Sequence, residues 1–133
     1  MCLYSSTPIP TILEEDLYCY KKLYLFKGVF ITPYRFVGVK VPGKLVGEGP
    51  RKVLPITSPY RGTKYSITSG YIHAYLRCFF IIETITYQLQ FQSRRHHIAL
   101  CKIPKGTKVY FSNYPSGDRE VCAQEMEIIK IIA

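Results

Sequence analysis

The stretch Cys101-Lys102-Ile103-Pro104-Lys105-Gly106-Thr107-Lys108-Val109-Tyr110-Phe111 places two short apolar runs on either side of a Pro-Lys-Gly-Thr element. Proline presets φ to roughly −65° at the second position of a tight turn, and glycine takes the positive φ that follows. The pattern predicts a strand over 97–103, a tight turn, and a second strand over 109–111.

Composition indicates one folded, strand-rich domain. The chain has 133 residues, 47% of them hydrophobic, which is too apolar for a disordered chain. Twelve Tyr and seven Phe, with no Trp, favour strands. We therefore expect a single domain over 1–133, in which residues 1–13, interrupted by Pro8 and Pro10, form a loose lead-in.

The leading part of the chain also predicts strands. Leu17 to Phe26 is rich in Tyr, Leu and Phe, and Lys27-Gly28 forms a two-residue turn into a second strand over 29–32. Glycine and proline predominate from 34 to 63, so this middle part is expected to consist mainly of loops. Short extended pieces are expected at 36–41, 52–56, 65–68 and 71–75.

The residues that follow predict one helix and a closing strand. From Ala74 to Gln90 the spacing changes to that of a helical face, although several β-branched residues are stiff in a helix. Residues 113–118 are rich in turn formers, and 122–132 predicts a strand. The expected fold class is α+β, mainly an antiparallel sheet with one main helix.

Two groups of residues are candidates for a metal site. The five cysteines, at 2, 19, 78, 101 and 122, are odd in number and contain no CxxC spacing, which predicts buried, reduced thiols. His96 and His97 are adjacent, so on a strand they point to opposite faces and cannot easily bind one ion. No metal and no resident cofactor are expected.

The net charge indicates which partners the protein could bind, and the first residues of the chain indicate where in the cell it is located. Eighteen basic against nine acidic residues give +9, which permits weak, nonspecific attraction to nucleic acid. The stretch from Tyr34 to Tyr65 combines basic residues with tyrosines that can stack on bases, but it carries no known nucleic-acid motif. Met1 to Asp16 lacks the basic and apolar regions of a signal peptide, and no apolar run could span a bilayer. We expect a cytoplasmic protein without membrane contact.

A candidate site combines a histidine with two carboxylates. His73 follows Ser69-Gly70 at the expected transition from sheet to helix, where side chains often face a cleft. Glu125 and Glu127 are two apart on a strand and share a face, where they repel unless a basic partner or a function accompanies them. The alternatives are a half-buried structural histidine and an exposed polar face. The predicted ligand site holds His73 and Glu127, or Glu125, and is rimmed by Tyr71 and Tyr75.

The whole chain resembles a family of small proteins from gut Bacteroides-type bacteria and their mobile elements. The motifs that carry this resemblance are Met1-Cys2-Leu3, Cys19-Tyr20-Lys21, Thr32-Pro33-Tyr34, Ser58-Pro59-Tyr60, Gly70-Tyr71-Ile72-His73-Ala74-Tyr75 and Cys101 to Tyr110. The family brings no known activity.

From Ser69 onward the chain also resembles ADP-ribosyltransferase-type domains. The order of a Gly-Tyr element at Gly70, a strand that ends in Pro-Lys-Gly-Thr, and a final strand with Glu125-Met126-Glu127 is similar. The resemblance implies an NAD-dependent transferase in which His73, Glu125 and Glu127 are the candidate catalytic residues. This chain departs from the pattern, because His73-Ala74-Tyr75 replaces Ser-Thr-Ser and the first strand has no arginine for the dinucleotide.

The leading expectation is therefore a small non-catalytic binding or accessory domain, a degenerate relative of the ADP-ribosyltransferase fold, with a cleft near His73 and Glu127. The alternatives are an NAD-dependent ADP-ribosyltransferase-like enzyme and a basic nucleic-acid-binding protein. Fold analogy does not choose among the three, since function belongs to sites rather than folds.

Overall fold

The computed structural model describes residues 3–5, 8–32, 38–47, 53–59, 62–67, 70–76, 96–112 and 120–132. These ranges contain antiparallel strands and no helix. In chain order the strands are β1 (Leu3–Ser5), β2 (Thr11–Ile12), β3 (Leu17–Phe26), β4 (Val29–Ile31), β5 (Gly38–Val39), β6 (Gly43–Val46), β7 (Val53–Ser58), β8 (Gly62–Ile67), β9 (Ile72–Tyr75), β10 (His96–Ile103), β11 (Lys108–Phe111), β12 (Glu120–Ala123) and β13 (Glu125–Ile131).

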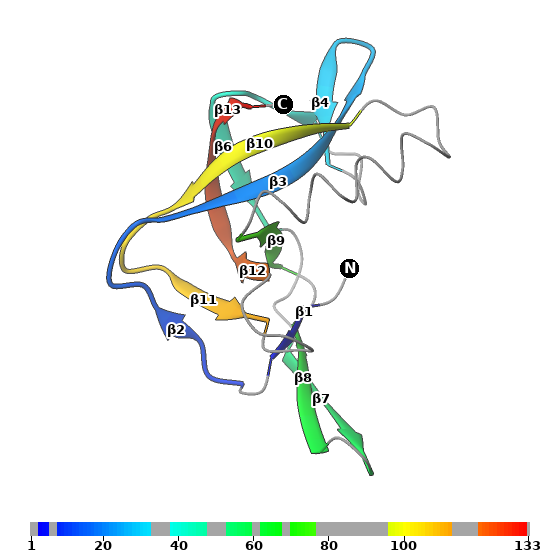
Figure 1. Cartoon of the computed structure of the whole chain (residues 1–133), viewed down its shortest axis with the longest axis vertical. Helices are drawn as coiled ribbons and strands as arrows, with labels where there is room; N and C mark the ends of the chain where they lie inside the picture. Colours follow the sequence, from blue (N-terminus) through cyan, green and yellow to red (C-terminus); the bar gives the residue numbers. More distant parts are fainter. Residues whose placement is uncertain are drawn as a thin grey trace.

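The described strands form two sheets. The main path of the larger sheet runs β2-β11-β12-β9-β3-β10-β13-β6, with β4 beside β3 and β5 beside β4. The smaller sheet has the order β1-β8-β7. In Figure 1 the long strands β3 and β10 lie side by side across the upper part, and β7 and β8 extend away at the bottom.

The main core lies on one face of the larger sheet. Alternate residues of the two central strands, among them Cys19 and Leu23 of β3 and Cys101 of β10, are fully buried there. Leu45 of β6 and Val109 of β11 belong to the same core cluster, although their strands lie near opposite ends of the strand order. The sheet must therefore curl around this core. Burial of each large apolar side chain contributes about 1.5–3 kcal/mol.

A second cluster connects the two sheets. Ile67 of β8, Tyr110 of β11 and Cys122 of β12 are buried together, and Tyr71 packs against them. The rings of Tyr71 and Tyr110 meet edge to face, with centroids 5.6 Å apart. Strand β1 also contacts β11 and β12, so the smaller sheet is attached at more than one point.

Both turn-based predictions are confirmed. The apolar runs around the Pro-Lys-Gly-Thr element form β10 and β11, and Gly106 has a φ of 87°. Strands β3 and β4 pair as a hairpin whose turn residues, Lys27 and Gly28, have φ values of 48° and 78°. The short strands β5, β7, β8 and β9 fall within or beside the extended pieces expected in the middle of the chain.

Other parts differ from the sequence-based expectation. The expected loose lead-in over 1–13 contains two strands, β1 and β2. Both are extended because β1 pairs with β8 and β2 pairs with β11. The expected closing strand is divided at Gln124 into β12 and β13, which pair with different neighbours. Strand β6 lies where only loops were expected.

The helix expected over 74–90 is not found in the part of the chain that the structure describes. Ala74 and Tyr75 belong to β9, where Ala74 is buried opposite Val121. Cross-strand pairing therefore determines the conformation there rather than the helical spacing of the sequence. Residues 77–95 lie outside the described ranges.

Candidate functional site

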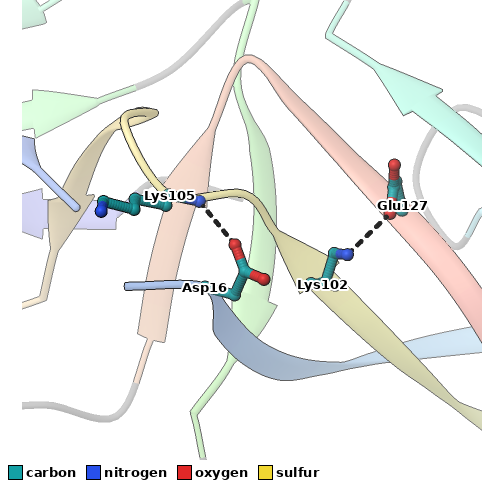
Figure 2. Close-up of polar contacts among 4 residues, drawn as sticks. All are labelled: Asp16, Lys102, Lys105 and Glu127. Atoms are coloured by element: carbon teal, nitrogen blue, oxygen red, sulfur yellow. Dashed lines mark hydrogen bonds and ion pairs between the residues drawn. The ribbon is translucent and has the colours of Figure 1, made fainter. Parts of the chain in front are cut away.

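The turn between β10 and β11 is held by backbone and side-chain hydrogen bonds. Thr107 N–H donates to the Pro104 carbonyl at 3.2 Å, which closes the turn. Leu13 makes two backbone hydrogen bonds with the turn. Its N–H donates to the Thr107 carbonyl, and its carbonyl accepts from the Gly106 N–H. The Lys105 N–H donates to Asp16 Oδ1 at 2.8 Å (Figure 2). This network fixes the Pro104–Thr107 turn beside the start of β3.

A row of side chains crosses the exposed face of four neighbouring strands. Lys102 of β10 lies opposite Tyr18 of β3 on one side and Glu127 of β13 on the other. Glu127 in turn lies opposite Lys44 of β6. Figure 2 shows Lys102 and Glu127 directed toward each other, with 3.7 Å between Nζ and Oε2. The two glutamates thus face solvent, while Met126 between them is buried.

Glu125 forms an ion pair with a second lysine, Lys44. Lys44 Nζ lies 2.9 Å from Glu125 Oε2, and this hydrogen bond raises the pKa of Lys44 above its ordinary value. Repulsion between Glu125 and Glu127, which share one face of β13, is therefore offset by a basic partner for each carboxylate. Lys44 and Lys102 are thus the basic partners that two carboxylates on one face require.

A surface pocket of about 190 Å³ lies beside these charges. Its described lining residues come from β6, from the β10–β11 turn and from the junction of β12 with β13: Lys44, Pro104, Thr107, Gln124, Glu125, Met126 and Glu127. The volume is below the roughly 300 Å³ at which pockets for drug-sized ligands begin. The pocket therefore fits one small group rather than a whole dinucleotide.

His73 lies on β9, opposite Cys122 of β12. Its Nδ1 is buried without a hydrogen-bond partner among the described residues. Burial, followed by the nearby Lys21 ammonium, lowers the pKa of His73 to about 4, so its imidazole is neutral at pH 7. The described residues contain no group of three or more side chains that could hold a metal ion, around His73 or elsewhere.

The predicted site residues divide between two places. Glu125 and Glu127 line the pocket, whereas His73, Tyr71 and Tyr75 are not among its described lining residues. The pairing of β9 with β12 places His73 on the strand beside the one that precedes Glu125. A single site shared by His73 and Glu127 stays a prediction.

Sequence reasoning missed the inward direction of Lys21. Its Nζ donates a hydrogen bond of 2.7 Å to the His73 carbonyl, and burial lowers the pKa of Lys21 to about 8. The signal was present in the sequence, because Lys21 alternates with Cys19 and Leu23, which are both apolar and buried. Position 21 therefore belongs to the core face.

Comparison with known protein families, curated proteins and solved structures finds no match to this chain. The described residues contain no helix that is long and apolar enough to cross a membrane.

Proposed function

We propose that this chain is a small cytoplasmic, non-catalytic binding domain. It holds a neutral, hydroxyl-rich group, such as a single sugar ring, in the pocket between β13 and the Pro104–Thr107 turn. The observation that carries the proposal is the pairing of each pocket carboxylate, Glu125 and Glu127, with a lysine of a neighbouring strand.

The charge balance favours a neutral ligand. Two carboxylates beside the pocket repel an anion such as a phosphate, and the lysines paired with them repel a cation. A hydroxyl group can donate to a carboxylate and accept from an ammonium, so it can join both kinds of partner at once. Thr107 and Gln124 add a hydroxyl and an amide, while Pro104 and Met126 offer apolar contact to the face of a ring.

The same arrangement favours binding over catalysis. Catalytic acids and bases usually lie in clefts, shielded from water. The side chains of Glu125 and Glu127 are each 48% exposed and lie beside lysines, as expected for surface recognition. The half-buried histidine, His73, is not among the described residues that line the pocket.

The finer fold assignment is also a proposal. An α+β domain related to the ADP-ribosyltransferase fold is supported by the position of β9 beside β12, because the resemblance requires the Gly70-Tyr71 element to lie near the final strands. An active, NAD-dependent transferase is the enzyme alternative. NAD hydrolysis that is lost in Glu127→Ala would establish that alternative.

Affinity measurements on matched variants test the binding role. Ribose and glucose are titrated separately into the full chain by amide-resolved NMR, and a dissociation constant on the order of millimolar is expected for a ligand this small. Glu127→Gln keeps the shape but removes a charged acceptor, so binding should weaken about tenfold. Glu14→Gln makes the same charge change at an exposed position that is not among the described lining residues, and it should leave affinity unchanged. Equal effects of the two variants would contradict the proposal.

A further inference from the structure

Two cysteines lie directly opposite each other at the centre of the larger sheet. Cys19 of β3 and Cys101 of β10 are register partners in an antiparallel pair. Such partners share a face, and their Cα atoms are about 4.5–5.5 Å apart. A disulfide requires Cα atoms about 4.4–6.8 Å apart, so the strand pairing already places these two residues within bonding range.

The surroundings of the two thiols are apolar and closed. Both residues are 0% exposed, both belong to the main core cluster, and both are free cysteines. Cys101 Sγ makes a weak hydrogen bond of 3.9 Å to the Ala99 carbonyl. Lys21 follows Cys19 by two positions on the same strand, so its stem leaves the same face, and its positive charge acts on both sulfurs.

We propose that Cys19 and Cys101 form a redox-controlled disulfide that locks β3 to β10. A hydroperoxide is the oxidant. One thiolate attacks a peroxide oxygen, so that an S–O bond forms, the O–O bond breaks, and the leaving oxygen takes up the thiol proton as water. The second thiolate attacks the resulting sulfenic acid, the S–S bond forms, the S–O bond breaks, and a second water leaves. Two thiols are thereby oxidised by two electrons, and one hydrogen peroxide is reduced to two waters.

The surroundings of Cys19 and Cys101 keep both thiols reduced until an oxidant is present. Burial raises the pKa of Cys19 to about 12 and that of Cys101 to about 11, and only the thiolate is a good nucleophile. Complete burial also keeps oxidants out while β3 and β10 are packed. The disulfide therefore forms slowly, in molecules whose central strands have opened locally, and then joins positions that are far apart in the sequence. A bond across so long a loop restricts the unfolded chain and raises resistance to unfolding.

Peptide mapping of the full chain tests the proposal, and Cys122 serves as the internal control. Cys122 is also 0% exposed and its pKa is likewise raised to about 12, but the residues opposite it are Tyr110 and His73. The folded protein is treated with hydrogen peroxide, its remaining thiols are alkylated under denaturing conditions, and the peptides are analysed by mass spectrometry. We expect a peptide carrying Cys19 linked to one carrying Cys101, lighter by two hydrogens and separated again by a thiol reductant. Cys122 should be recovered as an alkylated thiol.

Variants and thermal unfolding add independent readouts. Cys122→Ser should form the same bond, and oxidised wild type should melt several degrees above the reduced protein. A variant that cannot form the bond, such as Cys101→Ser, is not needed. The main readout uses wild-type protein, so the test does not depend on whether that variant folds. Alkylation of Cys19 and Cys101 as separate thiols after prolonged oxidation, or pairing of either with Cys2 or Cys78 as often as with each other, would overturn the proposal.

Discussion

Lys21 donates a hydrogen bond from its Nζ to the carbonyl oxygen of His73, 2.7 Å away and 52 positions later in the chain. The lysine starts from the core face of β3, between the buried residues Cys19 and Leu23. Its head group therefore connects β3 to β9 from within the core. Burial lowers the pKa of Lys21 to about 8, because the charged form is disfavoured away from water.

Replacing this lysine should make stability respond differently to pH. Between about pH 8 and 10.5 the unfolded chain keeps a proton on Lys21 that the folded chain has lost, so the free energy of unfolding rises with pH in this window. We expect Lys21→Met to be at least as stable as wild type at pH 7, since an apolar side chain replaces a buried charge. That advantage should shrink toward pH 10, by about 1.4 kcal/mol for each unit of pKa depression. Urea unfolding at pH 7, 8, 9 and 10 under reducing conditions measures it.

The comparison with wild type removes the effect of the thiols. Cys19, Cys101 and Cys122 have pKa values raised from 9.0, so above that pH their unfolded forms ionise first and stability falls in both proteins. Lys44→Met is the matched control, because the pKa of this exposed lysine is raised and its contribution is lost only above pH 10.5. A large destabilisation of Lys21→Met at pH 7 that did not change with pH would count against the buried-charge account.

His73 should remain neutral at pH values well below those at which histidine ordinarily takes up a proton. Its folded pKa of about 4 lies below the ordinary value of 6.5, so the stability that it contributes is fully present above pH 6.5 and is lost as the pH falls toward 4. Imidazole resonances followed by NMR should show one histidine with a midpoint near 4, assigned by its absence in His73→Gln. A midpoint at or above 6 for His73 would show that its ring is solvated.

Gly47 should tolerate no side chain. A Cβ at this position would lie 2.1 Å from the Gly70 carbonyl oxygen, and backbone atoms cannot yield as a flexible side chain can. Gly47→Ala should therefore destabilise the fold by about 1–3 kcal/mol. Gly38→Ala is the control, because its nearest neighbour, Val29 Cγ1, lies at an ordinary 3.7 Å. Similar unfolding midpoints for the two variants would show that β6 and the start of β9 do not approach so closely.

The turn before β11 needs glycine for a different reason. Nothing lies within 4 Å of a Cβ at Gly106, but its φ of 87° is strained for any L residue. Gly106→Ala should cost about 1–2 kcal/mol, as measured by chemical unfolding. Lys105→Ala, next to it, should be nearly neutral, since the Asp16 carboxylate accepts from its backbone N–H rather than its side chain. Equal losses in both variants would mean that side-chain contacts, not the backbone, determine this turn.

Sequence reasoning succeeded where a turn is specified by its own residues. Lys27-Gly28 and Pro104–Thr107 contain the residues that their backbone angles require, so the β3–β4 hairpin and the turn that joins β10 to β11 could be predicted from short windows. Strand β6 could not be predicted, because only Leu45 turns inward and its conformation comes from pairing with the distant β13.

The candidate site shows the same division. Period-two alternation correctly placed Glu125 and Glu127 on one face. Their partners, Lys44 and Lys102, come from strands far from each other in the sequence, and the register that brings them together depends on the whole sheet. No local pattern contains that information.

One NMR experiment tests the central claim, that the pocket beside Glu125 and Glu127 binds a neutral sugar without catalysis. Ribose is added to one sample of the labelled full chain and NAD to another, and the protein amides and the nicotinamide protons are followed for a day. The account predicts that ribose will cause shift changes centred on Thr107 and 124–127, and that NAD will be left intact. Release of nicotinamide, or ribose-induced shift changes confined to 70–75, would contradict it.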